Sequence, residues 1–200
     1  MKNIELKIFY RKNLYIKKIL MFFLAITVLF ASCSDEQTVI NTEEKAILTF
    51  YNNAISDTTG TMNIVDSAIV DGIIKLSFDV GNGNEIEAGD SVYFYYIGAV
   101  LNSTNINNYI NTSNVFVTNI DSIAIQCQLQ GMVGRGIEKG IVGKNHYIKG
   151  LDIGLTMLNE YEDALIFFPS RLAYGGNSMG TVSGNSPIIF RIIVTNIKKN

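Results

Sequence analysis

The sequence is poor in the residues on which most catalytic and metal chemistry depends. Its 200 residues include one His, two Cys, two Pro and no Trp. A single His excludes a multi-histidine metal centre, and two Cys are too few for a zinc ribbon. Neither a phosphate-binding P-loop nor a Gly-x-Ser-x-Gly nucleophile motif occurs. We therefore expect no metal ion and no cofactor.

The chain also lacks a large excess of either positive or negative charge. The chain has 16 basic and 18 acidic side chains, which excludes the strongly basic domain typical of nucleic-acid-binding proteins. Apolar residues, by contrast, make up 48% of the chain, and this fraction excludes an intrinsically disordered protein. The length is sufficient for one domain with its own hydrophobic core and an additional segment.

The first 32 residues have the pattern of an export signal. Residues 1–18 carry six basic side chains and one acidic side chain, and an apolar run follows at 19–31. A basic segment followed by about 7–15 apolar residues is typical of a secretory signal peptide, whereas a membrane-spanning helix needs about 20. The run ends in Leu-Phe-Ala-Ser-Cys, which resembles a bacterial lipobox and predicts a lipid on Cys33. The alternatives are an uncleaved anchor, or an ordinary signal followed by a chance Cys.

Removal of residues 1–32 would change the charge balance. The rest of the chain keeps 10 basic and 17 acidic side chains, a net charge of −7. A domain this acidic is not suited to binding nucleic acid or an anionic membrane surface through its body. Residues 34–42 are polar and predict a short tether. We expect a lipid-anchored protein of the cell envelope, on its periplasmic or its outer side.

The remaining sequence predicts an N-terminal helix followed mainly by strands. Residues 41–44 have the spacing of a capping box, and apolar residues then recur at helical intervals, which predicts a helix over 43–55. Segments 68–70 and 73–76 flank Asp71-Gly72, a pair typical of a type I′ hairpin turn.

Three later segments are rich in β-branched and aromatic residues and predict strands; they are 92–96, 163–168 and 188–197. Over 150–158, three leucines share one face of a predicted helix; they are Leu151, Leu155 and Leu158. Mostly antiparallel strands with a short packed helix predict an α+β fold.

Other segments are expected to carry no chemistry. Residues 101–114 are rich in Asn and predict a loop, and the spaced glycines of 131–143 predict a flexible loop. Cys127 lies in an alternating segment, which predicts a small buried strand residue. His146 has no nucleophile near it in sequence and is expected at the surface or in packing. Three acids before the strand at 163–168 are expected to be solvated; they are Glu160, Glu162 and Asp163.

Five short motifs occur in the order found in one protein family. The most specific is Phe-Pro-Ser-Arg-Leu-Ala-Tyr-Gly at 168–175, which resembles the family pattern I-P-x-x-L-A-Y-G. The others lie at 89–98 (G-x-x-V, then H-Y-x-G), 115–119 (F-D-S/T-S/N), 142–155 (L-G, V-I-x-G-W/L, G-L) and 188–192 (L-x-F-x-V). From about residue 73 to residue 198 the chain resembles an FKBP-type peptidyl-prolyl isomerase.

This resemblance implies an FKBP-like antiparallel β-sheet wrapped around one short central helix, with an N-terminal helical segment before it. The chain would then consist of a lipoprotein signal peptide at 1–32, a segment at 33–72 with the lipidated Cys, tether and N-terminal helix and strand, and an isomerase domain at 73–200. Proline-containing polypeptides would be its clients. In some relatives a helical N-terminal segment mediates dimerisation, a role that 34–72 could also have.

The resemblance also implies which residues form an apolar proline-binding site. The catalytic residues would be Tyr96, Phe116 and Tyr174, with the phenol of Tyr174 donating a hydrogen bond to a substrate carbonyl. The other substrate-binding residues would be Tyr147, Ile148, Leu151, Val182 and Phe190. Leu151 would form the floor, where many relatives have Trp. The backbone carbonyl of His146 and the amide of Ile148 would hold the bound peptide.

One position departs from the family pattern. The usual Phe-Asp pair is Phe116-Val117 here, and in active relatives that Asp lies beside the tyrosine at the position of Tyr96. Asp121 could replace it only with a shifted alignment. Two functions therefore stay open: a membrane-tethered prolyl isomerase that assists the folding of exported proteins, and a catalytically weak or inactive FKBP-like module that binds peptides or assists assembly.

Overall fold

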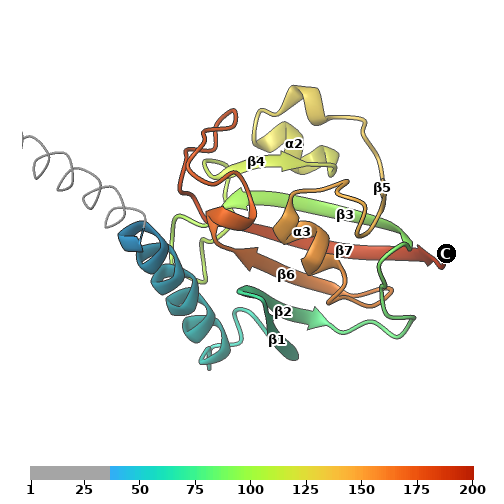
Figure 1. Ribbon diagram of the computed structural model, residues 1–200, viewed down its shortest axis with the longest axis horizontal. Helices are drawn as coiled ribbons and strands as arrows, with labels where there is room; N and C mark the ends of the chain where they lie inside the picture. The colour runs from blue at the N-terminus through green and yellow to red at the C-terminus, as the bar shows by residue number, and fades with distance from the viewer. Residues whose placement is uncertain (1–36) are drawn as a thin grey trace, which may run out of the picture. The chain divides into compact units, whose positions relative to one another are not determined.

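The structure, a computed structural model, describes residues 37–200. Within it, Thr42–Asn200 form one compact unit, which is the fold shown in Figure 1. The predicted signal peptide and Cys33 lie outside the described residues. No helix in the described part of the chain is long and apolar enough to cross a membrane.

Seven antiparallel strands form a single sheet. Their order across the sheet is β1-β2-β6-β7-β3-β4, and β5 pairs with β3. β4 pairs with Ile97–Ala99 of β3 and β5 with Ser91–Phe94. The strands are β1 (Asp66–Val70), β2 (Ile73–Asp79), β3 (Ser91–Val100), β4 (Val115–Thr118), β5 (Glu138–Ile141), β6 (Asp163–Phe168) and β7 (Ile188–Lys198). Short helices complete the fold: α2 (Asp121–Gln126), α3 (Lys149–Leu155) and the 3₁₀ turns η1 (Gln130–Met132) and η2 (Ser170–Leu172). The predicted α+β class is confirmed.

The β1–β2 hairpin forms as predicted. Asp71 and Gly72 have φ angles of 53° and 80°, and both central residues of a type I′ turn need positive φ. The turn coincides with the predicted boundary between 33–72 and 73–200. β1 pairs with β2 along its whole length, so residues from both sides of that boundary share one sheet.

β6 shows that the sheet is buried on both faces. Its residues alternate between two hydrophobic clusters: Ala164, Ile166 and Phe168 point to the first, and Leu165 and Phe167 to the second. All five are fully buried, which explains why the strand is a continuous apolar run. α3 covers the first face. Helical residues 42–55, which we call the N-terminal helix, cover the second.

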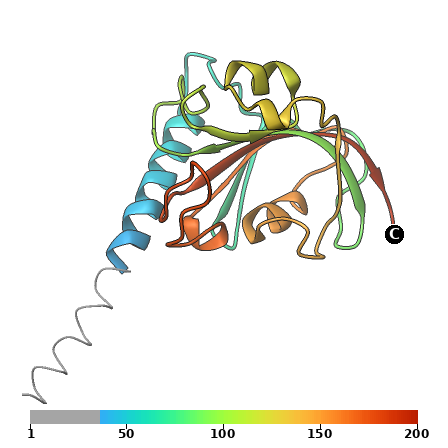
Figure 2. The same ribbon diagram turned by 90° about the horizontal axis from the view of Figure 1, so that it is seen from above.

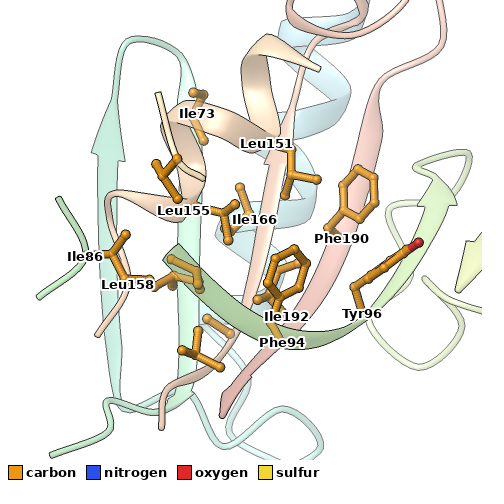
Figure 3. Packing of buried hydrophobic residues seen from close by; sticks show 14 of the residues in the cluster. Ile73, Ile86, Phe94, Tyr96, Leu151, Leu155, Leu158, Ile166, Phe190 and Ile192 are labelled. Atoms are coloured by element: carbon orange, nitrogen blue, oxygen red, sulfur yellow. The ribbon is translucent and has the colours of Figure 1, made fainter. Parts of the chain in front are cut away.

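The sheet curves around α3 (Figure 2). Leu151 and Leu155 of α3 are buried against the strands, with Leu158 beyond the end of the helix (Figure 3). Two glycines allow this close approach. A Cβ atom on Gly150 would overlap the ring of Phe168, and one on Gly154 would lie 2.5 Å from Cγ2 of Ile166. The helix therefore packs closer to β6 than a residue with a side chain at either position would allow.

The predicted start of the N-terminal helix is wrong, although its end at residue 55 is confirmed. The chain is already helical from residue 37, so 41–44 do not form a capping box. Glu43, which lies inside these four residues, is buried. Its carboxylate accepts hydrogen bonds from Ser170, which lies 127 residues later.

The predicted strand around Cys127 is also wrong, because residues 121–126 form α2. Ala124 is fully buried, and Ile123 and Cys127 pack against the second cluster. Positions 123, 124 and 127 have helical spacing, which competes with the alternating pattern of the same segment. Cys127 is the C-cap residue of α2 and is half-buried.

The prediction that the acids around the start of β6 are solvated is wrong. Glu162 is fully buried and Glu160 is 8% exposed. Glu160 accepts a hydrogen bond from the amide of Ile197 at 3.0 Å. Asp163 accepts two from the guanidinium of Arg191, at 3.0 and 2.8 Å. Glu160 thus connects the turn before β6 to β7, and Asp163 connects the first residue of β6 to β7. Glu162 connects the turn to β2.

Candidate active site

All eight predicted site residues lie together between α3 and the concave face of the sheet. Tyr96, Leu151, Val182 and Phe190 belong to the first hydrophobic cluster, and Phe116, Tyr147, Ile148 and Tyr174 pack against it. They come from β3, β4, the turn before α3, α3 itself, the turn after η2, the loop before β7, and β7. In Figure 3 the side chains of Tyr96, Phe190 and Leu151 converge from three of these elements.

Phe190 lies at the centre of the aromatic residues. Its ring centroid lies 6.2 Å from that of Tyr96, 6.1 Å from Phe116 and 6.3 Å from Phe168. Phe116 in turn contacts Tyr174 edge-on at 6.3 Å. Phe190 is 3% exposed, whereas Phe116 and Tyr174 are half-buried. The rings therefore form a continuous apolar surface that is closed at its base and open towards Phe116 and Tyr174.

Gly98 of β3 makes room for this arrangement. A Cβ atom at this position would lie 2.6 Å from Cε1 of Phe190 and 2.6 Å from Cγ1 of Val117. Both contacts are shorter than carbon atoms tolerate, so any larger residue would displace one of these side chains. Gly98, which ends the family motif at 89–98, is thus required in this chain for steric reasons.

The backbone of Tyr96 is fixed by two polar residues at the end of β4: Thr118, the last residue of the strand, and Asn119, which follows it. Asn119 is buried; its Oδ1 accepts a hydrogen bond from the amide of Tyr96 at 2.8 Å, and its Nδ2 donates one to the carbonyl of Phe94 at 3.0 Å. Thr118 Oγ1 donates to the carbonyl of Tyr96 at 2.7 Å. These side chains replace a strand partner where β4 ends, and they position the Tyr96 ring.

Tyr147 is packed tightly and has an isolated hydroxyl group. Its ring lies 5.7 Å from that of Phe94, and its hydroxyl lies directly over Gly140 of β5. That hydroxyl is buried and has no hydrogen-bond partner among residues 37–200. Burial, and after it the negative charge of Glu138, raises the pKa of Tyr147 well above its ordinary value.

The other two tyrosines also keep their protons. Burial raises the pKa of Tyr174 and of Tyr96. For Tyr96 the charge of Glu138 raises the pKa further, and Arg135 acts in the opposite direction. All three phenols are therefore hydrogen-bond donors at neutral pH.

Glu138 is a site residue that the sequence analysis missed, because 131–143 was expected to be a flexible loop. It stands opposite Phe94 in the β3–β5 pair, so the two share the concave face. Lys139, the next residue, lies over the ring of Tyr93 on the other face, 5.4 Å from its centroid. No sequence pattern indicated this short strand, because its buried residue is Gly140 and its apolar residue, Ile141, is exposed.

No carboxylate takes the place of the family's Asp in β4. Val117 pairs with Gly98 and packs against the first cluster. Asp121 cannot substitute, because its carboxylate accepts a hydrogen bond from the amide of Gly134 at 2.8 Å and so holds the segment after α2. His146 is exposed, and its ring contacts that of Tyr147 at 5.3 Å, as expected for a surface or packing residue.

The fold and the site define a domain with an apolar, aromatic surface between a curved sheet and a short helix. Within the described residues no group of three His, Cys, Asp or Glu side chains is placed to hold a metal ion. Residues 82–195 match the sequence model of the family described as FKBP-type peptidyl-prolyl cis-trans isomerase. The chain belongs to this family.

Individual relatives agree with this assignment. FK506-binding protein 4 of Emericella nidulans is 29% identical over 141 residues, which are 70% of this chain and 24% of the relative. FK506-binding protein 4 of Chaetomium thermophilum is 27% identical over 130 residues, 65% of this chain and 22% of the relative. The chain thus spans about a quarter of the length of these relatives.

Two solved structures share the fold. FkpA from Escherichia coli superposes with a TM-score of 0.53 at 17% identity, covering 92% of this chain and 71% of that one. The N-terminal domain of FKBP42 from Arabidopsis thaliana gives a TM-score of 0.50 at 16% identity, covering 67% of this chain and 93% of that one. The expected FKBP-like sheet around one short helix is confirmed.

Proposed function

We propose that the protein is a peptidyl-prolyl cis-trans isomerase that assists the folding of exported proteins at the cell envelope. The observation that carries this proposal is the convergence of all eight predicted residues on one aromatic site between α3 and the sheet. Proline-containing segments of client polypeptides are the substrates. The site has the chemistry for this reaction without any acid, base or metal.

The reaction requires rotation about an X-Pro amide. Its barrier is about 18–20 kcal/mol, because rotation breaks the amide resonance. The twisted amide has lost part of the charge separation of the planar form, so an apolar, water-poor site favours it over the ground state. Such differential binding accelerates the reaction. In this chain Phe190, Phe116 and Leu151 supply the apolar surface for the proline ring.

Polar contacts orient the peptide against this surface. The protonated phenol of Tyr174 is the donor to a substrate carbonyl. The amide of Ile148 donates no hydrogen bond within the described residues, and the carbonyl of His146 accepts none. Both groups stand beside Tyr147 at the start of α3, where they can pair with the backbone of an extended peptide.

A proline-limited refolding assay with the full-length chain in detergent micelles tests this proposal. We expect acceleration, and we expect Tyr174→Phe to lower kcat/KM by about two- to tenfold, because it removes one hydrogen bond worth about 0.5–1.5 kcal/mol. Tyr161→Phe is the matched control, since Tyr161 is 52% exposed and away from the cluster, and it should leave kcat/KM unchanged.

Val117 favours a second candidate, an inactive module that binds proline-containing segments. Val117→Asp distinguishes the two in the same assay. Absence of acceleration by the natural chain and by Val117→Asp, together with retained binding of a proline-containing peptide, would establish the binding module. Acceleration that is sensitive to Tyr174→Phe would exclude it.

The lipid anchor is the other part of the proposal, and it depends on the lipobox-like segment that ends at Cys33. Cells fed radiolabelled palmitate should label the natural chain, and Cys33→Ala should carry no label. Cys127→Ala is the matched control, because it removes the second Cys of the chain and should keep the label. Label retained in Cys33→Ala would contradict the anchor.

A further inference from the structure

The N-terminal helix makes a buried polar contact with the turn that leads to Tyr174. Both carboxylate oxygens of Glu43 are used: Oε2 accepts a hydrogen bond from the amide of Ser170 at 2.6 Å, and Oε1 accepts one from its hydroxyl at 2.7 Å. Glu43 is 6% exposed and Ser170 is 5% exposed. Hydrogen bonds to an ionised acceptor are about twice as strong as neutral ones, and a buried carboxylate depends on them. Ser170 is therefore held firmly by the helix.

Ser170 in turn holds the residues on both sides of Tyr174. Its carbonyl accepts hydrogen bonds from the amide of Ala173 at 2.7 Å and from that of Gly175 at 2.8 Å. Ser170 thus binds Glu43 through its amide and its hydroxyl, and it binds the turn around Tyr174 through its carbonyl. Consecutive hydrogen bonds of this kind strengthen one another in a low-dielectric interior.

Two further backbone hydrogen bonds hold this turn: the carbonyl of Tyr174 accepts one from the amide of Asn177 at 3.2 Å, and the carbonyl of Gly175 accepts one from the amide of Asn185 at 2.7 Å. Tyr174 is held mainly through its backbone. Its side chain is half-buried and contacts one aromatic ring, that of Phe116. Gly175 follows it with a φ of 60°, and the next residues are rich in Gly, Ser and Asn. The position of the phenol therefore depends on this backbone turn, whose start Ser170 holds.

We infer that Glu43 is a positioning residue for Tyr174, so that the N-terminal helix helps to order the active site. This inference rests on the proposed isomerase function for its kinetic consequence, but the contact itself does not. The helix lies outside residues 82–195, the part of the chain that matches the family. Glu43 thus adds to the site a residue from a segment that the family match does not include.

Glu44, the next residue, provides a matched control. It pairs with Arg171 at 3.6 Å, and both side chains are about half exposed, at 47% and 45%. Such exposed ion pairs contribute little to stability. Replacing Glu44 removes the same charge from the same helix turn and leaves Ser170 untouched.

The test compares Glu43→Ala, Glu43→Gln and Glu44→Ala in the full-length chain in detergent micelles. We expect Glu43→Ala to lower kcat/KM for prolyl isomerisation about three- to tenfold, mainly through kcat, and to accelerate amide exchange at Ala173 and Gly175. A 3-fluorotyrosine placed at position 174 should change its ¹⁹F signal. Glu43→Gln should retain most of each property, because its amide can accept from the Ser170 amide and donate to the hydroxyl. Glu44→Ala should change none of them.

A background of Tyr174→Phe separates positioning from general destabilisation. If Glu43 acts through the phenol, Glu43→Ala causes no further loss of kcat/KM in this background; an equal further loss would overturn the inference. Unchanged exchange and ¹⁹F signals in Glu43→Ala would also overturn it. If the chain proves inactive while these signals still respond to Glu43→Ala and not to Glu44→Ala, the positioning role holds and the isomerase proposal fails.

Discussion

Replacing Glu162 by Ala should lower the free energy of unfolding by about 3–5 kcal/mol, the usual loss when one partner of a buried ion pair is removed. Glu162 is fully buried. Its Oε1 accepts hydrogen bonds from Lys75 Nζ at 3.0 Å and from Ser77 Oγ at 2.6 Å, and its Oε2 accepts one from the amide of Asn159 at 2.8 Å. The substitution leaves the Lys75 ammonium in the interior with Asp66, an ion-pair partner that is 47% exposed.

Urea denaturation of the natural chain and three variants measures this loss. Glu85→Ala, at an exposed acid, should cost less than about 0.5 kcal/mol. Lys75→Met combined with Glu162→Gln should recover most of the stability. It removes the unpaired ammonium, and the Gln amide can accept from the amide of Asn159 through its oxygen and donate to the hydroxyl of Ser77 through its nitrogen. If Glu162→Ala cost no more than Glu85→Ala, the buried ion pair would not stabilise the fold.

The same ion pair predicts how stability changes at alkaline pH. Burial alone would lower the pKa of Lys75, but its hydrogen bonds to Glu162 and Asp66 outweigh burial and raise it above the ordinary value. The stabilisation that comes with this raised pKa is complete below the unfolded-state pKa of about 10.5. It is lost as the pH rises through the folded-state pKa. Glu162→Ala should reduce this alkaline loss, since the charged form of Lys75 is then less favoured.

The sequence predicted those features that depend on neighbouring residues. The hairpin needs only Asp71-Gly72 between two apolar segments, and the strands β6 and β7 follow from short β-rich runs. The structure also brings the predicted site residues together, because the family motifs contain all of them except Val182, which lies in the loop before β7. In all these cases the determining information lies within about ten residues.

Features that depend on distant partners could not be predicted in this way. Glu162 was expected to be solvated and no role was predicted for Glu43, because their partners Lys75 and Ser170 lie 87 and 127 residues away in sequence. α2 was mistaken for a strand because Ile123 and Ile125 alternate, while the helical spacing of Ile123, Ala124 and Cys127 became visible only with the second cluster in place. A short pattern that fits both periods is settled by what the segment packs against.

β5 was missed for a related reason. It has four residues, one of them Gly140, and strand propensity alone disfavours it. It forms because β4 covers only the far part of one edge of β3, which leaves Ser91–Phe94 free to pair. Once β5 is in place, its glycine determines where Tyr147 can lie.

Replacing Gly140 by Ala should therefore reduce kcat/KM by about tenfold to a hundredfold, because a misplacement of about 1 Å in a site can have an effect of this size. The added Cβ would overlap the hydroxyl and ring carbons of Tyr147. The φ of Gly140 is not positive, so the backbone accepts Ala and the strand stays intact. Tyr147 must then move away from Phe94 and into the space for substrate. The overpacking should also cost about 1–3 kcal/mol of stability.

Tyr147→Phe tests whether the collision with the hydroxyl is the cause. The hydroxyl is buried without a hydrogen-bond partner among residues 37–200, so its removal should not destabilise the chain, and it opens space above position 140. In the Tyr147→Phe background, Gly140→Ala should cost severalfold less in kcat/KM than in the natural chain. Gly131→Ala is the matched control, because its Cβ would meet no atom within 4 Å, and it should leave the rate unchanged. Equal losses from Gly140→Ala in both backgrounds would mean that Tyr147 is not displaced through its hydroxyl, and an unaltered rate would remove Tyr147 from the substrate-binding residues.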